Sequence, residues 1–361
     1  MRALTIDAHG GLEQIRYRDD LPVPDFSSDA DAPEVRVRVR AAALNRLDLF
    51  TIGGLPGITV TPGWVLGADA TGVVDAVSDR AVQAGESAGS TGSGVAVGDR
   101  VVINPGISCR RCEFCLAGEQ SMCIRYRLLG EHLPGTFAEY VVVPATNVRR
   151  IPASVSDEVA APFTLATLTA WRMCVTRARV RAGDHVLIWG IGGGVALAAL
   201  QICKSLGAHV WVTSSSEDKL ARAKAMGADE LLDHATLDIG KEIRARTRKR
   251  GVDVVIDCVG ERTWAQSLGS LVKGGRLVTC GGTSGPNLTM DVRRLFWNQW
   301  SILGSTMGND AELDAVTAEL AAGRLTPPVD SVHDLADGRA AFERMRSGAQ
   351  FGKIVLRVAH D

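Results

Sequence analysis

Four cysteines close together in the sequence are the side chains best suited to bind a metal. They follow the spacing Cys-x2-Cys-x2-Cys-x7-Cys, at Cys109, Cys112, Cys115 and Cys123. Four thiolates so near one another can surround a tetrahedral Zn²⁺, with metal–sulfur distances of about 2.3 Å. Because the protein would supply all four ligands, no position stays open for water or substrate, and we expect one structural Zn²⁺ per chain. An iron–sulfur cluster, which four cysteines also hold, and a group of cysteines without a metal are the alternatives.

A glycine-rich turn is the second segment with a recognisable chemistry. Gly190, Gly192, Gly193 and Gly194 follow an apolar run at 186–189 and open a helix-like segment. Glycines at a strand-to-helix turn let a pyrophosphate approach the backbone N–H groups at the N-terminus of the helix. We therefore predict a dinucleotide site in which these glycines and the adjoining Val195 contact the cofactor. A tight turn without a ligand is the alternative.

The residues after the next strand indicate which nicotinamide cofactor binds. An acid at the end of this strand would bind the 2′-hydroxyl group of NAD, but the apolar run at 208–212 leads into a threonine and three serines. Lys219 and Arg222 follow within about one turn and supply positive charge for a 2′-phosphate. This pattern favours NADPH over NADH, with Ser214, Ser215 and Lys219 as cofactor contacts. The alternative is that the serines only cap the next helix.

These segments lie in two regions with different patterns. Residues 34–40 alternate valine with charged side chains, which predicts a strand with one buried face, and short apolar runs at 65–77 and 100–103 predict further strands of a small barrel or sandwich. From about residue 183, strands alternate with helices of roughly 10 to 15 residues, which predicts a parallel sheet with helices on both faces. The fold class is therefore α/β with a separate β domain.

The connecting and terminal segments are less regular. Residues 25–33 and 83–94 are rich in small residues without apolar periodicity and are predicted to be loops. The stretch from about 308 to 361 shows one helical pattern and a strand pattern at 353–358, which we expect to rejoin the N-terminal β domain.

Composition excludes several classes of protein. The 361 residues include 40 basic and 41 acidic side chains, so the formal charge of −1 argues against a nucleic-acid binder. The longest strongly apolar stretch, at 186–200, is shorter than the roughly 20 residues that cross a bilayer. No sustained apolar signal segment opens the chain, so we expect a cytoplasmic protein without a membrane partner. The eight cysteines then do not indicate a disulfide framework, and those outside the cluster are expected to be small buried apolar residues: Cys174, Cys203, Cys258 and Cys280.

The chain as a whole resembles the medium-chain dehydrogenase/reductase superfamily. The resemblance rests on the cysteine segment, the glycine turn, Gly67-Ala-Asp-Ala-Thr-Gly72, Asp257-Cys-Val-Gly260 and the closing Gly352-Lys-Ile-Val-Leu356. It implies a GroES-like β-barrel catalytic domain at 1–155 with a structural zinc lobe at about 105–126. It further implies a Rossmann NADP(H)-binding domain at 156–304, and a segment at 305–361 that completes the catalytic domain.

The zinc alcohol dehydrogenases of this superfamily hold a catalytic zinc that the sequence does not support. The positions of its three ligands correspond to Asn45, Ala68 and Leu165, and these side chains do not together bind Zn²⁺. A rearranged metal site that uses Asp48 or Asp69 is the alternative. We expect Asp69 instead to be hydrogen-bonded inside the barrel.

The same segments resemble the zinc-free quinone oxidoreductases, in which hydride passes from NADPH to a quinone or conjugated carbonyl. Asn45 is then the candidate catalytic residue, as a donor to the substrate oxygen or the nicotinamide ribose; a turn or cap role is its alternative. The resemblance implies a dimer or tetramer, and Tyr126, His132, Arg46 or solvent as the proton source. It adds further cofactor contacts at Thr169, Cys258, Val259, Gly281, Gly282, Thr283 and Lys353.

We therefore predict an NADPH-dependent oxidoreductase that reduces a small-molecule quinone, enal, enone or similar activated double bond without a catalytic metal. The alternatives are an alcohol dehydrogenase with a rearranged metal site and a catalytically silent NADPH-binding protein.

Overall fold

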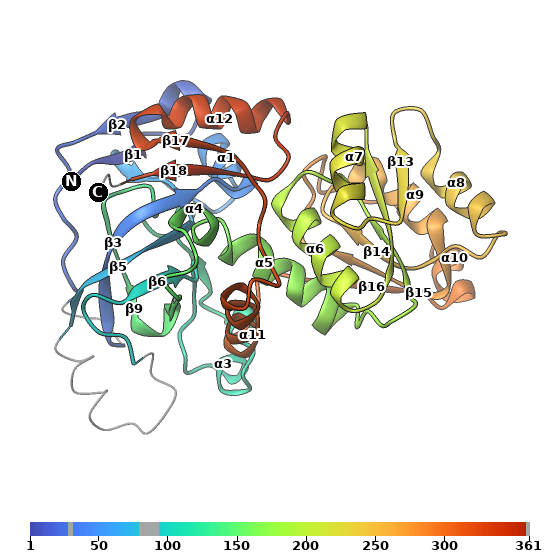
Figure 1. Ribbon diagram of the computed structural model, residues 1–361, viewed down its shortest axis with the longest axis horizontal. Helices are drawn as coiled ribbons and strands as arrows, with labels where there is room; N and C mark the ends of the chain where they lie inside the picture. The colour runs from blue at the N-terminus through green and yellow to red at the C-terminus, as the bar shows by residue number, and fades with distance from the viewer. Residues whose placement is uncertain (28–31, 79–93, 359–361) are drawn as a thin grey trace. The chain divides into compact units, whose positions relative to one another are not determined.

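Two compact units make up the protein. The structure, a computed structural model, describes residues 1–27, 32–78 and 94–358 (Figure 1). Unit 1 contains residues 1–166 together with the chain from residue 309 onward, and unit 2 contains residues 167–308. Most of the predicted loop at 83–94, and residues 28–31 of the predicted loop at 25–33, lie outside the described residues.

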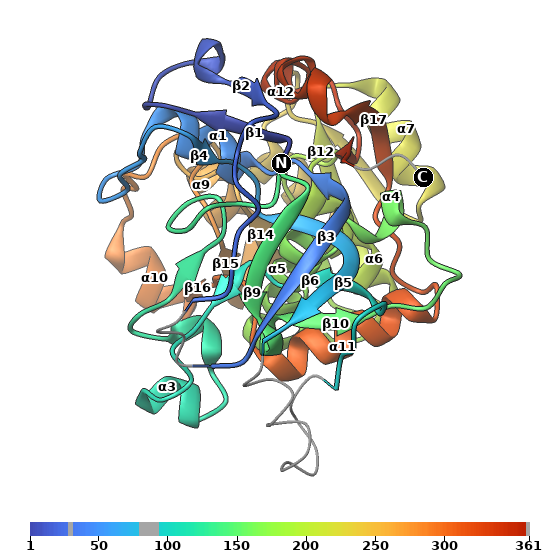
Figure 2. The same cartoon turned by 90° about the vertical axis from the view of Figure 1, so that its left-hand side faces the viewer.

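A seven-stranded sheet forms the centre of unit 1. Its long strand β3 (Glu34–Ala43) buries Val35, Val37 and Val39 on one face, as the alternating pattern predicts. The strand order is β10-β6-β5-β3-β18-β17, and β9 also pairs with β3 (Figure 1 and Figure 2). The other strands are β5 (Asp69–Val77), β6 (Arg100–Ile103), β9 (Tyr140–Pro144), β10 (Val148–Arg150), β17 (Val329–Asp334) and β18 (Lys353–Arg357).

Smaller elements complete unit 1. A three-stranded sheet has the order β2-β1-β4, and β7 pairs with β8. The bounds of these elements and of the short helices are β1 (Ala3–Ile6), η1 (Leu12–Gln14), β2 (Arg16–Arg18), α1 (Arg46–Gly53), β4 (Trp64–Val65), β7 (Gly106–Ile107), α3 (Glu113–Leu116), η2 (Gln120–Met122), β8 (Arg127–Leu128), η3 (Ala145–Asn147) and α4 (Asp157–Ala160).

The end of the chain returns to unit 1. The strand β18 lies between β3 and β17, so the expectation that residues 353–358 rejoin the N-terminal β domain is confirmed. The expectation of one helix in this region is wrong, because α11 (Asp310–Ala321), η5 (Leu335–Asp337) and α12 (Gly338–Ser347) all precede β18. Phe342 of α12 packs edge-on against Phe137 in the core, with ring centroids 6.1 Å apart.

Unit 2 is a six-stranded parallel sheet with the order β13-β12-β11-β14-β15-β16. This is the Rossmann arrangement, in which the chain reverses direction across the sheet between the first and fourth strands. The strands are β11 (His185–Ile188), β12 (His209–Ser214), β13 (Glu230–Asp233), β14 (Val252–Asp257), β15 (Leu271–Thr279) and β16 (Ser301–Gly304). The helices are the end of α5 (Thr164–Trp171), the π-helix η4 (Arg172–Arg177), α6 (Gly194–Ser205), α7 (Glu217–Ala225), α8 (Ile239–Arg246), α9 (Glu261–Ser270) and α10 (Val292–Asn298).

Local sequence explains this alternation. Buried strands such as β11 carry continuous apolar residues because helices cover both faces of a parallel sheet. Each unit has its own hydrophobic core: Leu4, Val37 and Phe137 belong to that of unit 1, and Leu187 and Trp264 to that of unit 2. Within the described ranges, none of the helices combines the length and apolar character that crossing a membrane requires.

Candidate functional site

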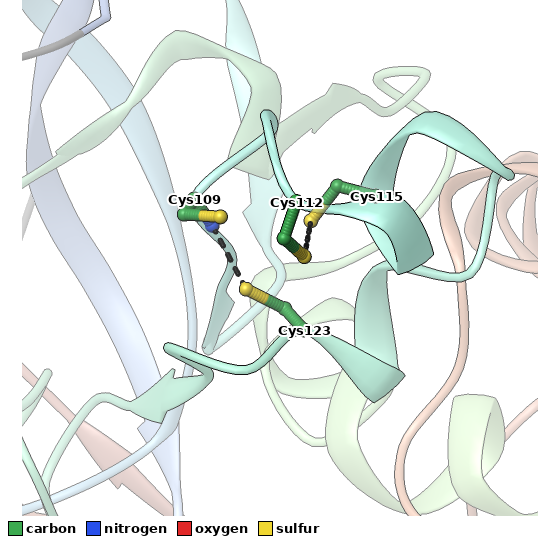
Figure 3. A group of neighbouring side chains, drawn as sticks. All are labelled: Cys109, Cys112, Cys115 and Cys123. Carbon is green, nitrogen blue, oxygen red and sulfur yellow. Dashed lines mark hydrogen bonds between the residues drawn. The ribbon is translucent and has the colours of Figure 1, made fainter.

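The four clustered cysteines converge on one point in unit 1. Cys109 lies two residues after β7, and Cys112 immediately precedes α3. Cys115 lies within α3, and Cys123 immediately follows η2. Their sulfur atoms all lie within 4.8 Å of one another (Figure 3). A tetrahedral ion with metal–sulfur bonds of about 2.3 Å needs ligands about 3.8 Å apart, so modest side-chain rotation closes the site around one Zn²⁺. This compact arrangement fits a single ion better than a cluster of several irons.

The backbone around these sulfurs also favours thiolates. The N–H groups of Cys109 and Arg125 donate to Cys123 Sγ over 3.2 and 3.3 Å. Hydrogen bonds from the backbone of Cys115 and Ile124 lower the pKa of Cys112 to about 6, whereas burial raises the pKa of Cys115 to about 12. A bound cation compensates for the cost of placing four thiolates together, so the residues present fit a structural zinc.

An ion pair and a hydrogen bond attach this cysteine lobe to helix α11. Arg110, between two of the cysteines, pairs with Asp310 at the start of α11, and the Asp310 N–H donates to Gln120 Oε1 over 3.2 Å. The lobe therefore connects the middle of the chain to its C-terminal part within unit 1.

The glycine turn of unit 2 has the conformation that a dinucleotide requires. Gly190 and Gly192 have φ angles of 67° and 125°, which side chains with a Cβ rarely adopt. The Gly190 N–H donates to Thr213 Oγ1 over 3.0 Å, which ties the turn to β12. Helix α6 then begins at Gly194 without a side-chain cap, and a Cβ at Gly193 would meet only open space. Backbone N–H groups at this end are thus left for an anionic ligand, so the residues fit a dinucleotide.

Two further loops end at the same edge of the parallel sheet. Cys258 and Val259 directly follow β14, and Gly281, Gly282 and Thr283 follow its neighbour β15. The loops pack tightly together: the Ser284 N–H donates to Val259 O over 2.8 Å, and a Cβ on Gly260 would lie 2.8 Å from Gly282 Cα.

Asp257, which the sequence analysis named only within the segment 257–260 and gave no role of its own, organises the first of these loops. Its buried carboxylate accepts hydrogen bonds from the N–H groups of Val259 and Gly260 and from the hydroxyl groups of Thr263 and Ser267. The sequence signal that could have identified this role is an acidic residue at the end of a predicted strand, followed within three residues by a glycine. The structure therefore brings the predicted contacts at 190–195, 258–259 and 281–283 to one edge of unit 2.

The serines after β12 lie at this edge too. Ser214 is buried, Ser215 is exposed, and Ser216 caps α7 by accepting a hydrogen bond from the Lys219 N–H over 3.4 Å. A capping role is thus present for Ser216, while Ser215 presents its side chain to solvent. Thr169 is buried on α5, where its hydroxyl lies 3.6 Å from Met307 Sδ.

Strand register explains a second cluster, in unit 1. Ala43 of β3 lies opposite Val355 of β18 on one side and opposite Asp69 of β5 on the other. Two residues beyond Ala43 is Asn45, and two residues before Val355 is Lys353. Because β3 and β18 are antiparallel, Lys353 and Asn45 meet, with Asp69 on the neighbouring strand.

These three side chains form a buried polar network. Lys353 Nζ donates to Asn45 Oδ1, and it lies 3.1 Å from Asp69 Oδ2; the lysine side chain is 5% exposed and the aspartate 0%. Asn45 Nδ2 donates to the same Asp69 oxygen over 2.9 Å. The second Asp69 oxygen accepts from the Thr164 hydroxyl and the Leu165 N–H, each over 2.8 Å. The expectation that Asp69 is hydrogen-bonded inside this domain is confirmed.

Lys353 retains donor capacity in this network. An ammonium group has three N–H donors, and two of them point to Asn45 and Asp69. In the described chain, the third has no protein acceptor. Lys353, which the resemblance places among the cofactor contacts, lies beside Asn45 in unit 1.

By the resemblance noted in the sequence, this network lies at the positions at which zinc alcohol dehydrogenases hold their catalytic metal. Asn45 and Leu165 stand at two of the three ligand positions, and the third, Ala68, adjoins Asp69. An ammonium group bonded to the nearby carboxylate repels a divalent cation, so these residues do not fit a catalytic zinc. Asp48, the other acid proposed for a rearranged site, accepts a hydrogen bond from the Asn45 N–H over 2.7 Å, and burial raises its pKa to about 7. Asn45 is also the N-cap residue immediately before helix α1, as its alternative role supposed.

The proposed proton donors lie on the loops and helix near these elements. Arg46, the first residue of α1, is exposed. His132 Nδ1 accepts from the Leu128 N–H over 3.3 Å, and Tyr126 packs against Gly106. The structure brings none of the three into the hydrogen bonds described for Lys353, Asn45 and Asp69.

Two family models match the chain. A model described as "Zinc-binding dehydrogenase" matches residues 194–322, and a model described as "Alcohol dehydrogenase GroES-like domain" matches residues 31–153. Together they cover parts of both units.

Individual relatives extend the similarity over the whole length. The chain is 30% identical over 366 residues to a zinc-type alcohol dehydrogenase-like protein of Schizosaccharomyces pombe, and 99% of each chain is covered. It is 28% identical over 359 residues to an acryloyl-coenzyme A reductase of Metallosphaera sedula, again with 99% of each chain covered. A solved structure of an NAD-dependent alcohol dehydrogenase is 43% identical and has a TM-score of 0.88 over 99% of this chain and 100% of that one.

Proposed function

The chain belongs to the medium-chain dehydrogenase/reductase family of oxidoreductases, and we propose that within it the protein is an NADPH-dependent reductase of activated double bonds that uses no catalytic metal. The substrates proposed are quinones, enals, enones and related conjugated carbonyl compounds. The similarity to an acryloyl-coenzyme A reductase, whose name describes the reduction of such a double bond, supports this choice.

One observation carries the proposal: a buried lysine, and not a set of metal ligands, stands among the three zinc-ligand positions. The Lys353 ammonium group is held by Asn45 and Asp69 and has one N–H left to donate. A fixed positive donor in a buried site polarises a carbonyl oxygen and stabilises the negative charge that develops there. The lysine therefore performs the electrostatic task for which alcohol dehydrogenases use zinc.

The roles of the residues follow from their hydrogen bonds. When bound, NADPH supplies the hydride that adds to the β-carbon of the conjugated system. The third N–H of Lys353 donates to the carbonyl oxygen, on which the resulting enolate charge accumulates. Asn45 is a positioning residue, because its oxygen accepts from Lys353 and its amide group donates to Asp69 and the Ala43 carbonyl. Solvent supplies the proton to the α-carbon.

We assign the cofactor to the carboxyl edge of unit 2. The pyrophosphate is bound by Gly190, Gly192, Gly193, Gly194 and Val195, with the loops at 258–259 and 281–283 beside it. Ser214, Ser215 and Lys219 accommodate the 2′-phosphate of NADPH, since no acid ends β12. Thr169 is retained as a further contact.

Replacement of Lys353 tests the proposal. Lys353→Met should lower kcat for an enone by about 100-fold or more, the usual cost of removing one oxyanion donor, while NADPH affinity, measured by fluorescence titration, stays the same. The matched control is Arg344→Met, which breaks a partly buried ion pair with Asp330 elsewhere in unit 1. Since Lys353→Met leaves Asp69 buried without its cation, the double variant Lys353→Met/Asp69→Asn is measured as well. A kcat within threefold of wild type in both variants would refute the assignment.

The second candidate function is that of an alcohol dehydrogenase with a rearranged metal site. It is favoured by the 43% identity to a solved NAD-dependent alcohol dehydrogenase and by the two buried carboxylates of Asp48 and Asp69. Metal analysis combined with a substrate panel separates the two. One zinc per chain and reduction of enones with NADPH support our proposal, and two zincs per chain with alcohol oxidation support the alternative. Tight NADPH binding without turnover across the panel would indicate a catalytically silent binding protein.

We further propose that the protein is a homo-oligomer assembled through unit 2. Strand β16 lies at the edge of its sheet, and helix α10 beside it exposes large apolar side chains, with Phe296 63% and Trp297 72% exposed. An open sheet edge next to exposed aromatic residues is typical of a surface that another chain covers.

A further inference from the structure

The four cysteines outside the zinc lobe form two close pairs in unit 2. Cys203 Sγ lies 3.7 Å from Cys174 Sγ, and Cys258 Sγ lies 3.1 Å from Cys280 Sγ. The first pair is buried, as the sequence suggested for all four. The second pair is only partly buried, so that expectation is wrong for Cys258 and Cys280. The two pairs therefore differ in access to solvent.

The position of this partly buried pair allows a covalent bond. Cys258 directly follows β14 and Cys280 directly follows β15, and the residues before them, Asp257 and Thr279, lie opposite each other in parallel register. Neighbouring strands are about 4.8 Å apart, which is within the Cα separation that disulfides span. The two sulfurs need to approach by only about 1 Å to reach the bond length of about 2.05 Å.

We infer that Cys258 and Cys280 are a redox-active dithiol that disulfide oxidants such as glutathione disulfide convert to an intramolecular disulfide. The thiolate of one cysteine attacks a sulfur of the oxidant and releases one thiol. The thiolate of the other then attacks the mixed disulfide and releases the second thiol. Two electrons pass from the cysteines to the oxidant, and the two cysteine protons are balanced by the two thiols released.

The location of the pair links it to the cofactor. Val259 accepts two hydrogen bonds from Ser284, and the Thr283 hydroxyl lies 3.4 Å from the carbonyl of Cys258. A disulfide between the strand ends shifts these loops against each other, at the edge to which we assign NADPH. Oxidation should therefore lower turnover, and bound NADPH should slow oxidation. This last consequence rests on the proposed function, whereas disulfide formation does not.

The experiment treats the full-length, zinc-loaded protein with excess glutathione disulfide, followed by alkylation, digestion and mass spectrometry. We expect a cross-linked peptide that joins Cys258 to Cys280 and the loss of two alkylatable thiols. The single variants Cys258→Ala and Cys280→Ala should give only a glutathione adduct on the remaining cysteine. The buried Cys174–Cys203 pair is the internal control and should stay reduced.

Several results would overturn the inference. The first is recovery of both cysteines as thiols under conditions that fully oxidise a small reference dithiol. The second is glutathione adducts on both cysteines without a cross-link, and the third is cross-linking confined to the zinc lobe. Dithiothreitol should restore the thiols and the NADPH turnover together. A protein that forms the cross-link but has no reductase activity would contradict the proposed function and leave the dithiol established.

Discussion

The lysine and aspartate that neutralise each other inside unit 1 are separated by 284 positions in the sequence. Their meeting depends on the register of three strands, and no local pattern contains that information. The sequence predicted that the catalytic zinc ligands are absent, because that inference needs only the residue types at 45, 68 and 165. It did not predict what replaces them, because Lys353 reaches this place through a strand pairing that forms only in the folded chain.

Asp48 gives a pH-dependent prediction at the same scale. Burial raises its pKa from an ordinary value of 3.8 to about 7, despite the Asn45 N–H and nearby Lys353, which act in the opposite direction. Between these two pH values the folded state keeps a proton that the unfolded state has lost. The wild type therefore loses stability as the pH rises from about 4 to 7, by roughly 1.4 kcal/mol for each pKa unit at most.

Asp48→Asn should remove this penalty, because the amide oxygen still accepts from the Asn45 N–H. We expect the Tm of the variant to exceed that of wild type at pH 8 and the difference to vanish near pH 4. The comparison variant is Asp330→Asn. Burial acts to raise the pKa of Asp330, but the hydrogen bonds from Arg344 and from the Phe351 N–H, together with the charge of Arg344, outweigh it and the pKa is lowered. That variant should lose stability at pH 8. A Tm difference for Asp48→Asn that does not change with pH would show that the carboxyl is not protonated in the fold.

At the scale of elements, the alternation of strands and helices in unit 2 was predictable, and its last strand was not. Apolar runs such as 186–189 and 252–256 carry their own signal, since a parallel strand is buried on both faces. Strand β16 lies at the edge of the sheet, and all four of its residues are exposed or only partly buried. So short a strand without a buried face has no recognisable apolar pattern in the sequence. In the C-terminal region the sequence predicted one helical pattern, whereas the structure has both α11 and α12, and Phe342 and Met345 of α12 belong to the core of unit 1.

Loss of one cysteine ligand in the lobe should lower both the zinc content and the stability of the protein. Cys112→Ser should reduce the zinc content from one ion per chain to well below one and lower the Tm, because three thiolates hold the ion less tightly than four. Elemental analysis and thermal unfolding measure both quantities. The control, Cys203→Ser, changes a buried cysteine of unit 2 and should leave the zinc content unchanged. Full zinc occupancy in Cys112→Ser would mean that this cysteine is not a ligand.

The serine loop after β12 predicts the coenzyme preference. Ser215→Asp places an acid where it repels the 2′-phosphate and can bind the ribose hydroxyls of NADH. We expect the KM for NADPH to rise about tenfold or more, with little change for NADH. Ser215→Asn, of the same size and without the charge, should change neither greatly. If the wild type already turns over faster with NADH than with NADPH, the assignment of Ser214, Ser215 and Lys219 to a 2′-phosphate is wrong.

At the scale of the whole molecule, the proposed assembly rests on the apolar surface of α10. Phe296→Glu combined with Trp297→Glu should lower the molar mass measured by light scattering to that of the monomer, 38.3 kDa. Val97→Glu, which alters an exposed apolar residue of unit 1, should leave the mass unchanged. A wild-type protein that is already monomeric at micromolar concentration would refute this part of the proposal.

The central place of β18 has a consequence for the order in which the protein becomes functional during synthesis. Unit 2 is complete when residue 308 has been made, whereas the strand between β3 and β17 begins only at Lys353. Domains form as their residues leave the ribosome, so unit 2 can fold while the sheet of unit 1 still lacks its inner strand. The same strand carries the lysine of the buried network. A chain truncated before residue 353 would therefore contain all of unit 2, to which we assign the cofactor, and would lack the lysine of the buried network.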